Sequence, residues 1–251
     1  MQIGKTEKYI LESLEKKSGL LFSLVDPVDY KSPELAIKSG KYSADAGADV
    51  VLIGGSMGVQ GELLDTVAKE IKSHASVPVV LFPGNISTVT KYADAIYFMT
   101  LLNSRNPYWI SQAQMLAAST VAQMKVEPLP VGYIVVSPGG TVGWVGDVNL
   151  VPREKPQIAA ALALAAQYSG DRFVLTDTGS NPKEGHVPLE MVKAVASAID
   201  VPYIVAGGIR TPEQAKSIIA TGGDIVQIGT ALEQKANMAA IADAVHNARK
   251  K

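Results

Sequence analysis

The chain has 251 residues, of which 47% are hydrophobic and 19% charged, so its composition supports a large buried core and argues against disorder. The 23 lysines and arginines against 24 aspartates and glutamates leave a formal net charge of -1, without the basic excess of nucleic-acid or polybasic membrane binders. The absence of cysteine excludes disulfides, thiolate nucleophiles and sulfur-based metal sites, and the three histidines are too widely spaced for a metal cluster. The N-terminus is too charged for a signal peptide, and residues 106–124 are too polar to span a membrane. We expect a globular, cytoplasmic protein.

Eight short apolar runs alternate with helix-length amphipathic stretches along the chain. The runs are continuous rather than alternating in polarity, as is typical of parallel strands buried on both faces. In chain order the predicted strands are Leu20–Val25, Val50–Ile53, Val79–Phe82, Ala95–Met99, Gly132–Val136, Phe173–Thr176, Tyr203–Ala206 and Ile225–Ile228.

Helical patterns fill the intervals between these runs. An extra helix at about Thr6–Lys17 precedes the first strand, and we expect it to close the floor of a barrel. The segment Ser87–Tyr92 is short and predicts a single helical turn. The other predicted helices are Pro33–Ala46, Glu62–Ser73, Trp109–Met124, Pro156–Tyr168, Pro188–Ala198, Thr211–Ala220 and about Lys235–Asn247.

Two short patterns recur, which suggests a repeated strand–helix unit. Ala46–Asp49 and Thr221–Asp224 each end a helix with glycine and then open a strand. Val77-Pro78 and Val201-Pro202 precede the third and seventh strands in the same way.

Alternating strands and helices without a break in composition indicate an α/β protein, either one doubly wound sheet or a closed barrel. Eight units in 251 residues favour a single (β/α)₈ TIM-type barrel domain over residues 1–251. Within it, residues 1–19 carry the N-terminal helix. Residues 137–155 form a long loop after strand five, rich in Gly and Pro, which we interpret as a functional lid.

Glycine turns follow the last two strands, at the barrel end where active sites form. Gly207-Gly208 follows strand seven and Gly229-Thr230 follows strand eight. Backbone N–H groups in such turns bind phosphate because glycine allows close approach, so we predict a phosphate site here. The alternative is that these glycines only shape turns, with Thr211-Pro212 starting the next helix.

Oxygen-bearing side chains end three of the other strands. Asp26 and Ser56, after strands one and two, offer hard oxygen ligands that suit Mg²⁺, although an Asp before proline also commonly makes a turn hydrogen bond. Asp177, after strand six, is the best candidate general base, and an ion-paired or capping aspartate is the alternative.

Aromatic residues gather in the middle third of the chain. Strand four, the helix after it and strand five would together wall an apolar groove, with simple barrel-to-helix packing as the alternative for at least half of these rings. The residues are Tyr97, Phe98, Tyr108, Trp109, Tyr133 and Trp144.

Six sequence blocks between about Leu20 and Glu233 together resemble one enzyme family, the geranylgeranylglyceryl phosphate synthases, in the larger of its two groups and related to the heptaprenylglyceryl phosphate synthases. The blocks at 103–109 and 138–147 are specific to that family. The six blocks are Leu24–Pro27, Ile53–Ser56, Leu81–Asn85, Tyr92–Ile96, Leu101–Trp109 and Pro138–Asp147.

The resemblance implies a (β/α)₈ barrel prenyltransferase. The reaction would join geranylgeranyl diphosphate to sn-glycerol 1-phosphate and release diphosphate, the first ether bond of archaeal-type membrane lipids. It implies that Asp26 and Ser56 bind the cofactor Mg²⁺, and that Leu175–Asn181 with the two glycine turns hold the glycerol phosphate. It also implies a homo-oligomer, either a dimer or a hexamer, whose product passes to the membrane. By segment, the implied substrate-binding residues are Leu175, Thr176, Asp177, Thr178, Gly179, Ser180, Asn181, Gly207, Gly208, Gly229 and Thr230.

One segment departs from the family pattern. Relatives read Tyr-Leu-Glu-Ala-Gly-Ser-Gly where this chain reads Leu175-Thr176-Asp177-Thr178-Gly179-Ser180-Asn181, so the acid is one methylene shorter and a tyrosine hydroxyl is absent. In the predicted reaction Asp177 orients or deprotonates the glycerol 3-hydroxyl, while the site excludes water from the developing carbon cation.

Three other functions remain open on the sequence. The prenyl donor is longer in the first, as in the heptaprenylglyceryl phosphate synthases. The second is an isomerase of a small phosphorylated metabolite, which would share the phosphate turns. The third is a barrel that binds prenyl lipids or phosphates without turnover.

Overall fold

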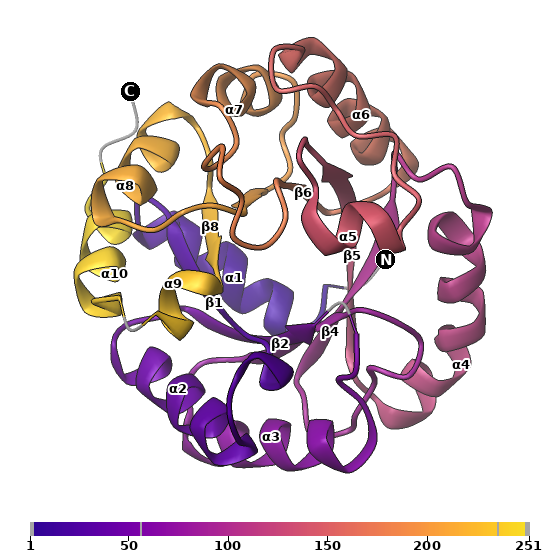
Figure 1. The fold of residues 1–251 in the computed structure, drawn as a ribbon, viewed down its shortest axis with the longest axis vertical. Coiled ribbons are helices and arrows are strands. Elements are labelled where there is room, and N and C mark those ends of the chain that lie inside the picture. Colours follow the sequence, from indigo (N-terminus) through magenta and orange to yellow (C-terminus); the bar gives the residue numbers. More distant parts are fainter. Residues whose placement is uncertain (1–2, 56, 235, 249–251) are drawn as a thin grey trace.

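The computed structural model describes residues 3–55, 57–234 and 236–248. Eight parallel strands pair in chain order, and the last pairs with the first, so the sheet closes into the predicted barrel (Figure 1). The strands are β1 (Leu20–Val25), β2 (Val50–Gly55), β3 (Val79–Pro83), β4 (Ala95–Leu101), β5 (Glu127–Val135), β6 (Phe173–Asp177), β7 (Tyr203–Ala206) and β8 (Ile225–Ile228).

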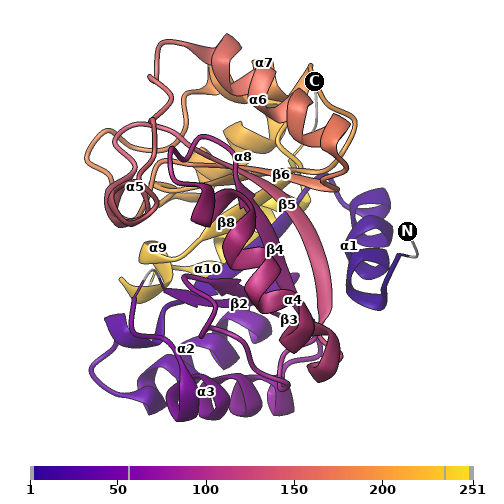
Figure 2. The ribbon, with the colours of Figure 1, turned by 90° about the vertical axis from the view of Figure 1, so that its right-hand side faces the viewer.

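Helices surround the barrel and mark its two ends (Figures 1 and 2). The outer ring consists of α2 (Pro33–Asp45), α3 (Gly61–His74), α4 (Ala113–Met124), α6 (Pro156–Ser169), α7 (Leu189–Ala196), α8 (Pro212–Thr221) and α10 (Met238–His246). Helix α1 (Lys5–Lys16) lies at the N-terminal ends of the strands, opposite the short helices α5 (Gly140–Val145) and α9 (Thr230–Glu233). None of the described helices has both the length and the apolar character needed to cross a bilayer.

The period-two alternation of the strands divides the core into two layers. On β1, Leu20 and Phe22 point into the barrel, whereas Leu21 and Val25 pack against the outer helices. All four are fully buried, which explains why the strand sequences read as unbroken apolar runs.

The floor of the barrel is closed by α1, as predicted. Ile10 of this helix packs into the inner layer of the core. The N-terminal N–H groups of Thr6 and Glu7 donate to the Glu127 carboxylate at the start of β5, at 2.7 and 2.9 Å. A carboxylate at a helix N-terminus satisfies N–H groups that have no partner within the helix.

Aspartates at strand starts repeat one hydrogen bond three times around this end. The carboxylate of Asp49 accepts from Leu21 N, that of Asp94 from Val79 N and that of Asp224 from Tyr203 N, at 2.8 to 3.0 Å. Two of these strands follow the recurring Val-Pro pairs. The repeat inferred from the sequence therefore corresponds to a shared contact that joins neighbouring strands.

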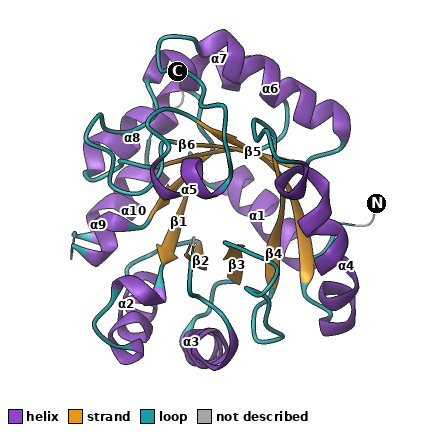
Figure 3. Ribbon diagram, turned by 45° about the vertical axis from the view of Figure 1, so that its right-hand side comes forward, coloured by secondary structure: helices purple, strands orange, loops and turns teal. Residues whose placement is uncertain are grey.

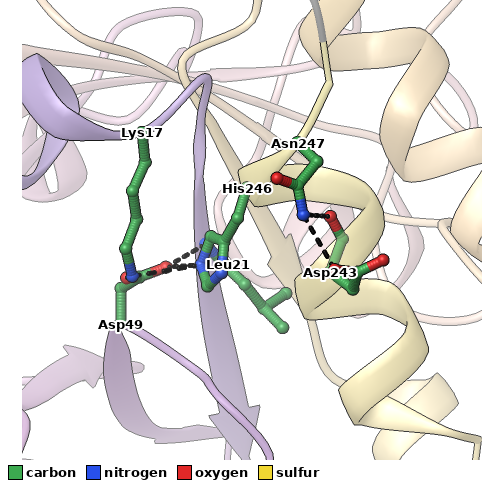
Figure 4. Close-up of polar contacts among 6 residues, drawn as sticks. All are labelled: Lys17, Leu21, Asp49, Asp243, His246 and Asn247. Carbon is green, nitrogen blue, oxygen red and sulfur yellow. Dashed lines mark hydrogen bonds and ion pairs between the residues drawn. The ribbon is translucent and has the colours of Figure 1, made fainter.

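Asp49 also joins the two ends of the chain (Figure 4). Its side chain is 1% exposed and receives Lys17 Nζ at 2.5 Å and His246 Nε2 at 2.7 Å. Lys17 follows α1 and His246 ends α10. This cluster fastens the floor helix and the last helix to β2.

The predicted helical turn at Ser87–Tyr92 is wrong. Residues 84–94, all of which the structure describes, contain turns but no helix (Figure 3). The Thr88 hydroxyl donates to the carbonyl of Val59, and the Thr90 hydroxyl accepts from Tyr92 N. Threonine side chains that bond the backbone in this way compete with helix formation. The β3–β4 side of the barrel therefore has no covering helix between α3 and α4.

Strand β5 begins at Glu127, five residues before its predicted start at Gly132. The prediction missed this part because proline is uncommon within strands, and Pro128 and Pro130 lie in it. Both prolines lie in the part of β5 that pairs with β4 and precedes its pairing with β6. Two predicted helices also differ at their starts. Residues Tyr108–Gln112 form a π-helical turn before α4, and α10 begins at Met238, while Lys235 lies outside the described residues.

Candidate active site

A cavity of about 1110 Å³, counting its open mouth, lies at the C-terminal ends of the strands. It is lined from β1 round to β8, the position of active sites in barrels of this kind. Polar groups gather on the β5–β8 side. Phe82, Met99 and Trp109 make the side at β3 and β4 apolar.

Asp177 ends β6 on the inner face of the barrel and lines this cavity. Its Oδ2 accepts a 2.7 Å hydrogen bond from the Tyr133 hydroxyl, and its Oδ1 accepts one of the same length from Gly179 N. Burial raises the pKa of the carboxyl, and these two hydrogen bonds only partly offset that effect. The raised pKa brings Asp177 closer to the range in which a carboxylate accepts a proton efficiently.

Asp26 faces the same cavity from the end of β1, with Asp29 and Glu233 beside it. Burial, followed by the charge of Asp29, raises the pKa of Asp26 to about 7. Gly55 is required next to it, because its φ is +136° and a Cβ there would come within 2.5 Å of Asp26 Oδ1. Ser56, the other predicted metal ligand, lies outside the described residues. The carboxylate oxygens of Asp26, Asp29 and Glu233 repel one another, and such oxygens form a donor set that suits a hard divalent cation.

No described residues form a group of three or more His, Asp or Glu side chains arranged to enclose a metal ion. Mg²⁺ commonly takes only one or two carboxylates and completes its coordination with water and substrate phosphate. The donors at the β1 end fit that mode of binding.

The predicted phosphate turns lie where the sequence places them. Gly207, Gly208, Gly229 and Thr230 all line the cavity, on the same side as Asp177. Gly207 has a φ of +80°, and a Cβ there would lie 2.6 Å from Asp177 Oδ1. The glycine therefore brings the backbone of the β7 turn against the candidate base.

The segment after β6 divides between the cavity and the core. Asp177, Gly179, Ser180 and Asn181 line the cavity. Leu175, Thr176 and Thr178 are fully buried and do not line it. The expectation that they contact a ligand stays a prediction. Leu175 belongs to the inner core, and the Thr176 hydroxyl bonds that of Tyr203 at 2.7 Å.

Several cavity residues escaped the sequence prediction. Gln227 lies within an apolar strand run, and a polar side chain in such a run was the available signal. Tyr133 was predicted as an aromatic wall of the groove, but its hydrogen bond to Asp177 was not. Arg210 follows the predicted glycine turn and lines the cavity, with its guanidinium bonded to Asn181 Oδ1 at 2.8 Å and to the carbonyl of Pro182.

The long loop after β5 covers part of the mouth and contributes Val142, Val145 and Gly146 to the cavity wall. Arg153 holds the base of this loop in place. Its guanidinium donates to the carbonyl of Ser137 and to those of Glu184, Gly185 and His186. The structure therefore makes the loop part of the site.

The two family-specific blocks contact one another at this point. Arg105 pairs with Asp147 at 2.5 Å, and the Ser104 hydroxyl donates to the carbonyl of Gly146 at 2.6 Å. Asn103 also bonds the backbone of Val135 in both directions. These contacts between residues far apart in the sequence hold Gly146, which lines the cavity, against the segment after β4.

A second, mainly apolar cavity adjoins the first on the side without a covering helix. The two share Pro83, Met99 and Trp109. Its other walls come from the β3–β4 connection, β4 and α4. Of the six predicted aromatic residues, Tyr97, Phe98, Trp109 and Tyr133 line one or both cavities. Tyr108 and Trp144 line neither, and Trp144 is 88% exposed.

The chain matches the model of the PcrB family over residues 13–248. It is 54% identical to the geranylgeranylglyceryl phosphate synthase of Pyrococcus horikoshii, covering 93% of this chain and 91% of the relative. It is 53% identical to that of Thermococcus sibiricus, covering 95% and 92%.

A solved structure shares this architecture. It is the (S)-3-O-geranylgeranylglyceryl phosphate synthase of Thermoplasma acidophilum in complex with its substrate sn-glycerol-1-phosphate, with a TM-score of 0.91, 34% identity and coverage of 98% of this chain and 99% of that one. By sequence and by fold, the chain belongs to the PcrB family, among the geranylgeranylglyceryl phosphate synthases.

Proposed function

We propose that this chain transfers the geranylgeranyl group of geranylgeranyl diphosphate to the 3-hydroxyl of sn-glycerol 1-phosphate, with Mg²⁺ as cofactor. The observation that carries the proposal is the division of the site. Asp177 and the glycine turns line one side of the cavity, and an apolar second cavity opens from the other side at Trp109.

The polar side suits a small phosphorylated alcohol. Backbone N–H groups of the turns at Gly207-Gly208 and Gly229-Thr230 would bind its phosphate. Asp177 lies one strand away, so it would hold the far hydroxyl of a three-carbon alcohol. This arrangement supports glycerol phosphate as the acceptor, in agreement with the substrate named for the Thermoplasma relative.

The apolar side suits a long hydrocarbon chain. Met99 and Trp109 belong to both cavities, so a prenyl tail would pass between them from the first to the second. Phe82 and Met99 would keep water from the reacting carbon. In the reaction the C1–oxygen bond of the prenyl diphosphate breaks, a bond from C1 to the glycerol 3-oxygen forms, Asp177 takes the hydroxyl proton, and diphosphate leaves.

Asp26 would hold Mg²⁺, with Ser56 as the second protein ligand proposed from the sequence. The bound cation would neutralise charge on the departing diphosphate. Asp29 and Glu233 add negative charge at the same end of the cavity, which favours a cation there.

The assembly and location of the protein belong to the same proposal. We expect a homo-oligomer, either a dimer or a hexamer, in the cytoplasm. The exposed apolar side chains of Met115 and Leu116 on α4, at 66% and 51%, support burial between copies. Light scattering on purified protein would separate these states from a monomer.

The test of the reaction is product formation from the two purified substrates, followed by mass spectrometry. We expect geranylgeranylglyceryl phosphate with Mg²⁺ and none with EDTA. Equal turnover in EDTA would reject the metal role. Binding without product would leave a lipid-binding barrel, and a preference for a 35-carbon donor would reject the 20-carbon assignment.

A further inference from the structure

Gln227 is a polar residue within the otherwise aliphatic run Ile225–Ile228 of β8. Its side chain points into the barrel, is 3% exposed and lines the active-site cavity. Burying a carboxamide is unfavourable when one of its polar groups is left without a partner. Its position therefore calls for partners on both ends of the amide.

One end of the amide has a partner inside the protein. The Tyr97 hydroxyl donates to Gln227 Oε1 at 3.3 Å. Tyr97 is itself held by edge-on packing against Phe82, with ring centroids 5.4 Å apart. Within the described residues Nε2 has no hydrogen-bond partner, so the amide presents its N–H donors to the cavity.

Gln227 lies in one layer with the candidate base. Strand register pairs Asp177 of β6 with Ala206 of β7, and Ala206 with Gln227 of β8. Ala206 is small, so the space between the two polar side chains remains open to the cavity. The phosphate turns begin at Gly207 and Gly229, directly after these strand positions.

The other polar groups of this layer are already engaged. The Tyr133 hydroxyl donates a hydrogen bond to Asp177 Oδ2, and the Gly179 N–H donates one to Asp177 Oδ1. An alcohol held by its phosphate above β7 and β8, with its far hydroxyl at Asp177, would lie over Ala206 and beside Gln227. Its middle carbon would then be the one nearest to the Gln227 amide.

We propose that Gln227 is a specificity-determining residue whose Nε2 donates to the 2-hydroxyl of sn-glycerol 1-phosphate. The inference rests on the proposed function, and it adds a third contact to those of the phosphate and the 3-hydroxyl. Three contacts distinguish mirror images. In sn-glycerol 3-phosphate held by its two ends, the 2-hydroxyl points away from Gln227 and leaves the amide unpaired.

The test compares three acceptors in steady-state kinetics: sn-glycerol 1-phosphate, its mirror image sn-glycerol 3-phosphate, and 3-hydroxypropyl phosphate, which lacks the 2-hydroxyl. A site built to bond a hydroxyl discriminates strongly against analogues without it, so we expect the wild type to favour the first by about 100-fold in kcat/KM. In Gln227→Leu we expect both preferences to fall to about 3-fold, because the unpaired donor is removed. Turnover of 3-hydroxypropyl phosphate should stay within about 3-fold of the wild type.

Two further variants make the result decisive. Gln227→Glu keeps the shape and the acceptor for Tyr97 but replaces the N–H donor, so it should lose the same preference even if Gln227→Leu folds poorly. Tyr97→Phe removes the hydroxyl that orients the amide, and we expect an intermediate loss of preference.

Equal loss of kcat/KM for all three acceptors in the Gln227 variants would show a structural role and overturn the inference. Unchanged preferences would overturn it as well. A wild-type enzyme that makes no product from sn-glycerol 1-phosphate would instead overturn the proposed function, so the two failures are distinguishable.

Discussion

The Tyr133 hydroxyl donates a 2.7 Å hydrogen bond to Asp177 Oδ2 from the neighbouring strand of the barrel. In the strand register Tyr133 lies opposite Leu175, the position at which the family pattern has a tyrosine and this chain has none. The candidate base therefore has a phenol partner even though its own segment has lost one.

We predict that Asp177→Asn lowers kcat by about 10²- to 10⁴-fold, because the amide cannot accept the hydroxyl proton. Calorimetry should show that binding of sn-glycerol 1-phosphate changes by no more than about 3-fold, because the phosphate contacts remain. Thr178→Ser, beside it but outside the cavity lining, is the matched control. An Asp177→Asn variant with wild-type kcat would remove this residue from the chemistry.

The same pair predicts a change in pH dependence. Because the bond from Tyr133 lowers the pKa of Asp177, Tyr133→Phe should raise that pKa further. The base must be ionised to act, so the acidic limb of the profile of kcat/KM should move to higher pH. A uniform loss of rate with an unmoved limb would contradict this reading.

Mg²⁺ affinity should depend on pH because burial and the charge of Asp29 raise the pKa of Asp26 to about 7. Protons compete with the metal below that pH, so titrations should show affinity falling by about tenfold per pH unit there and levelling off above it. Asp29→Asn removes a repelling charge and should move the midpoint to lower pH. Asp65→Asn, on the outer helix α3, should not move it.

The two tryptophans form a matched pair for testing the prenyl path. Trp109 lines both cavities, whereas Trp144 lines neither. We expect Trp109→Ala to raise KM for geranylgeranyl diphosphate by about tenfold, because it removes apolar contact area, and to leave KM for glycerol phosphate within about 3-fold. Trp144→Ala should change neither value. A larger effect from Trp144 would place the prenyl chain elsewhere.

The Asp49 cluster should contribute to stability. Burial alone would raise the pKa of Asp49, but hydrogen bonds from His246, Lys17 and Leu21 outweigh burial and hold it below its usual value. We expect Asp49→Asn to lower the free energy of unfolding by about 3 kcal/mol at neutral pH, measured by urea denaturation. Asp243→Asn, an exposed change nearby, should cost no more than about 0.5 kcal/mol.

The depressed pKa of Asp49 also fixes the direction of the pH effect. A carboxyl with a lowered pKa stabilises the fold above its unfolded value of about 4, and this stabilisation is lost as pH falls through the folded value. The difference between wild type and Asp49→Asn should therefore shrink in acid. A difference that grows below pH 4 would contradict the assignment.

The sequence was sufficient for the barrel because parallel strands buried on both faces give continuous apolar runs that periodicity detects. It was misleading where side chains bond the backbone, as at Thr88 and Thr90, and where proline conceals a strand, as at Pro128. The Thr88 contact and the pairing of Pro128 with β4 depend on segments that lie far away in the chain.

The site was predictable to the extent that strand ends meet at one edge of a barrel. Asp26, Asp177 and the glycine turns follow from that rule. Which neighbours of Asp177 reach the cavity does not follow from it. Thr176 points outward and bonds Tyr203, whereas Leu175 points inward but belongs to the packed core layer that precedes Asp177 on β6. The Tyr133 and Gln227 contacts cross between strands, so only the closed sheet shows them.

The most direct test of this account is a crystal structure with sn-glycerol 1-phosphate and an unreactive analogue of geranylgeranyl diphosphate bound together. We predict the glycerol 3-hydroxyl within about 3 Å of the Asp177 carboxylate and the prenyl C1 about 3–3.5 Å from that hydroxyl, with the tail running past Trp109 into the second cavity. A prenyl chain lying outside that cavity, or a glycerol hydroxyl turned away from Asp177, would contradict it.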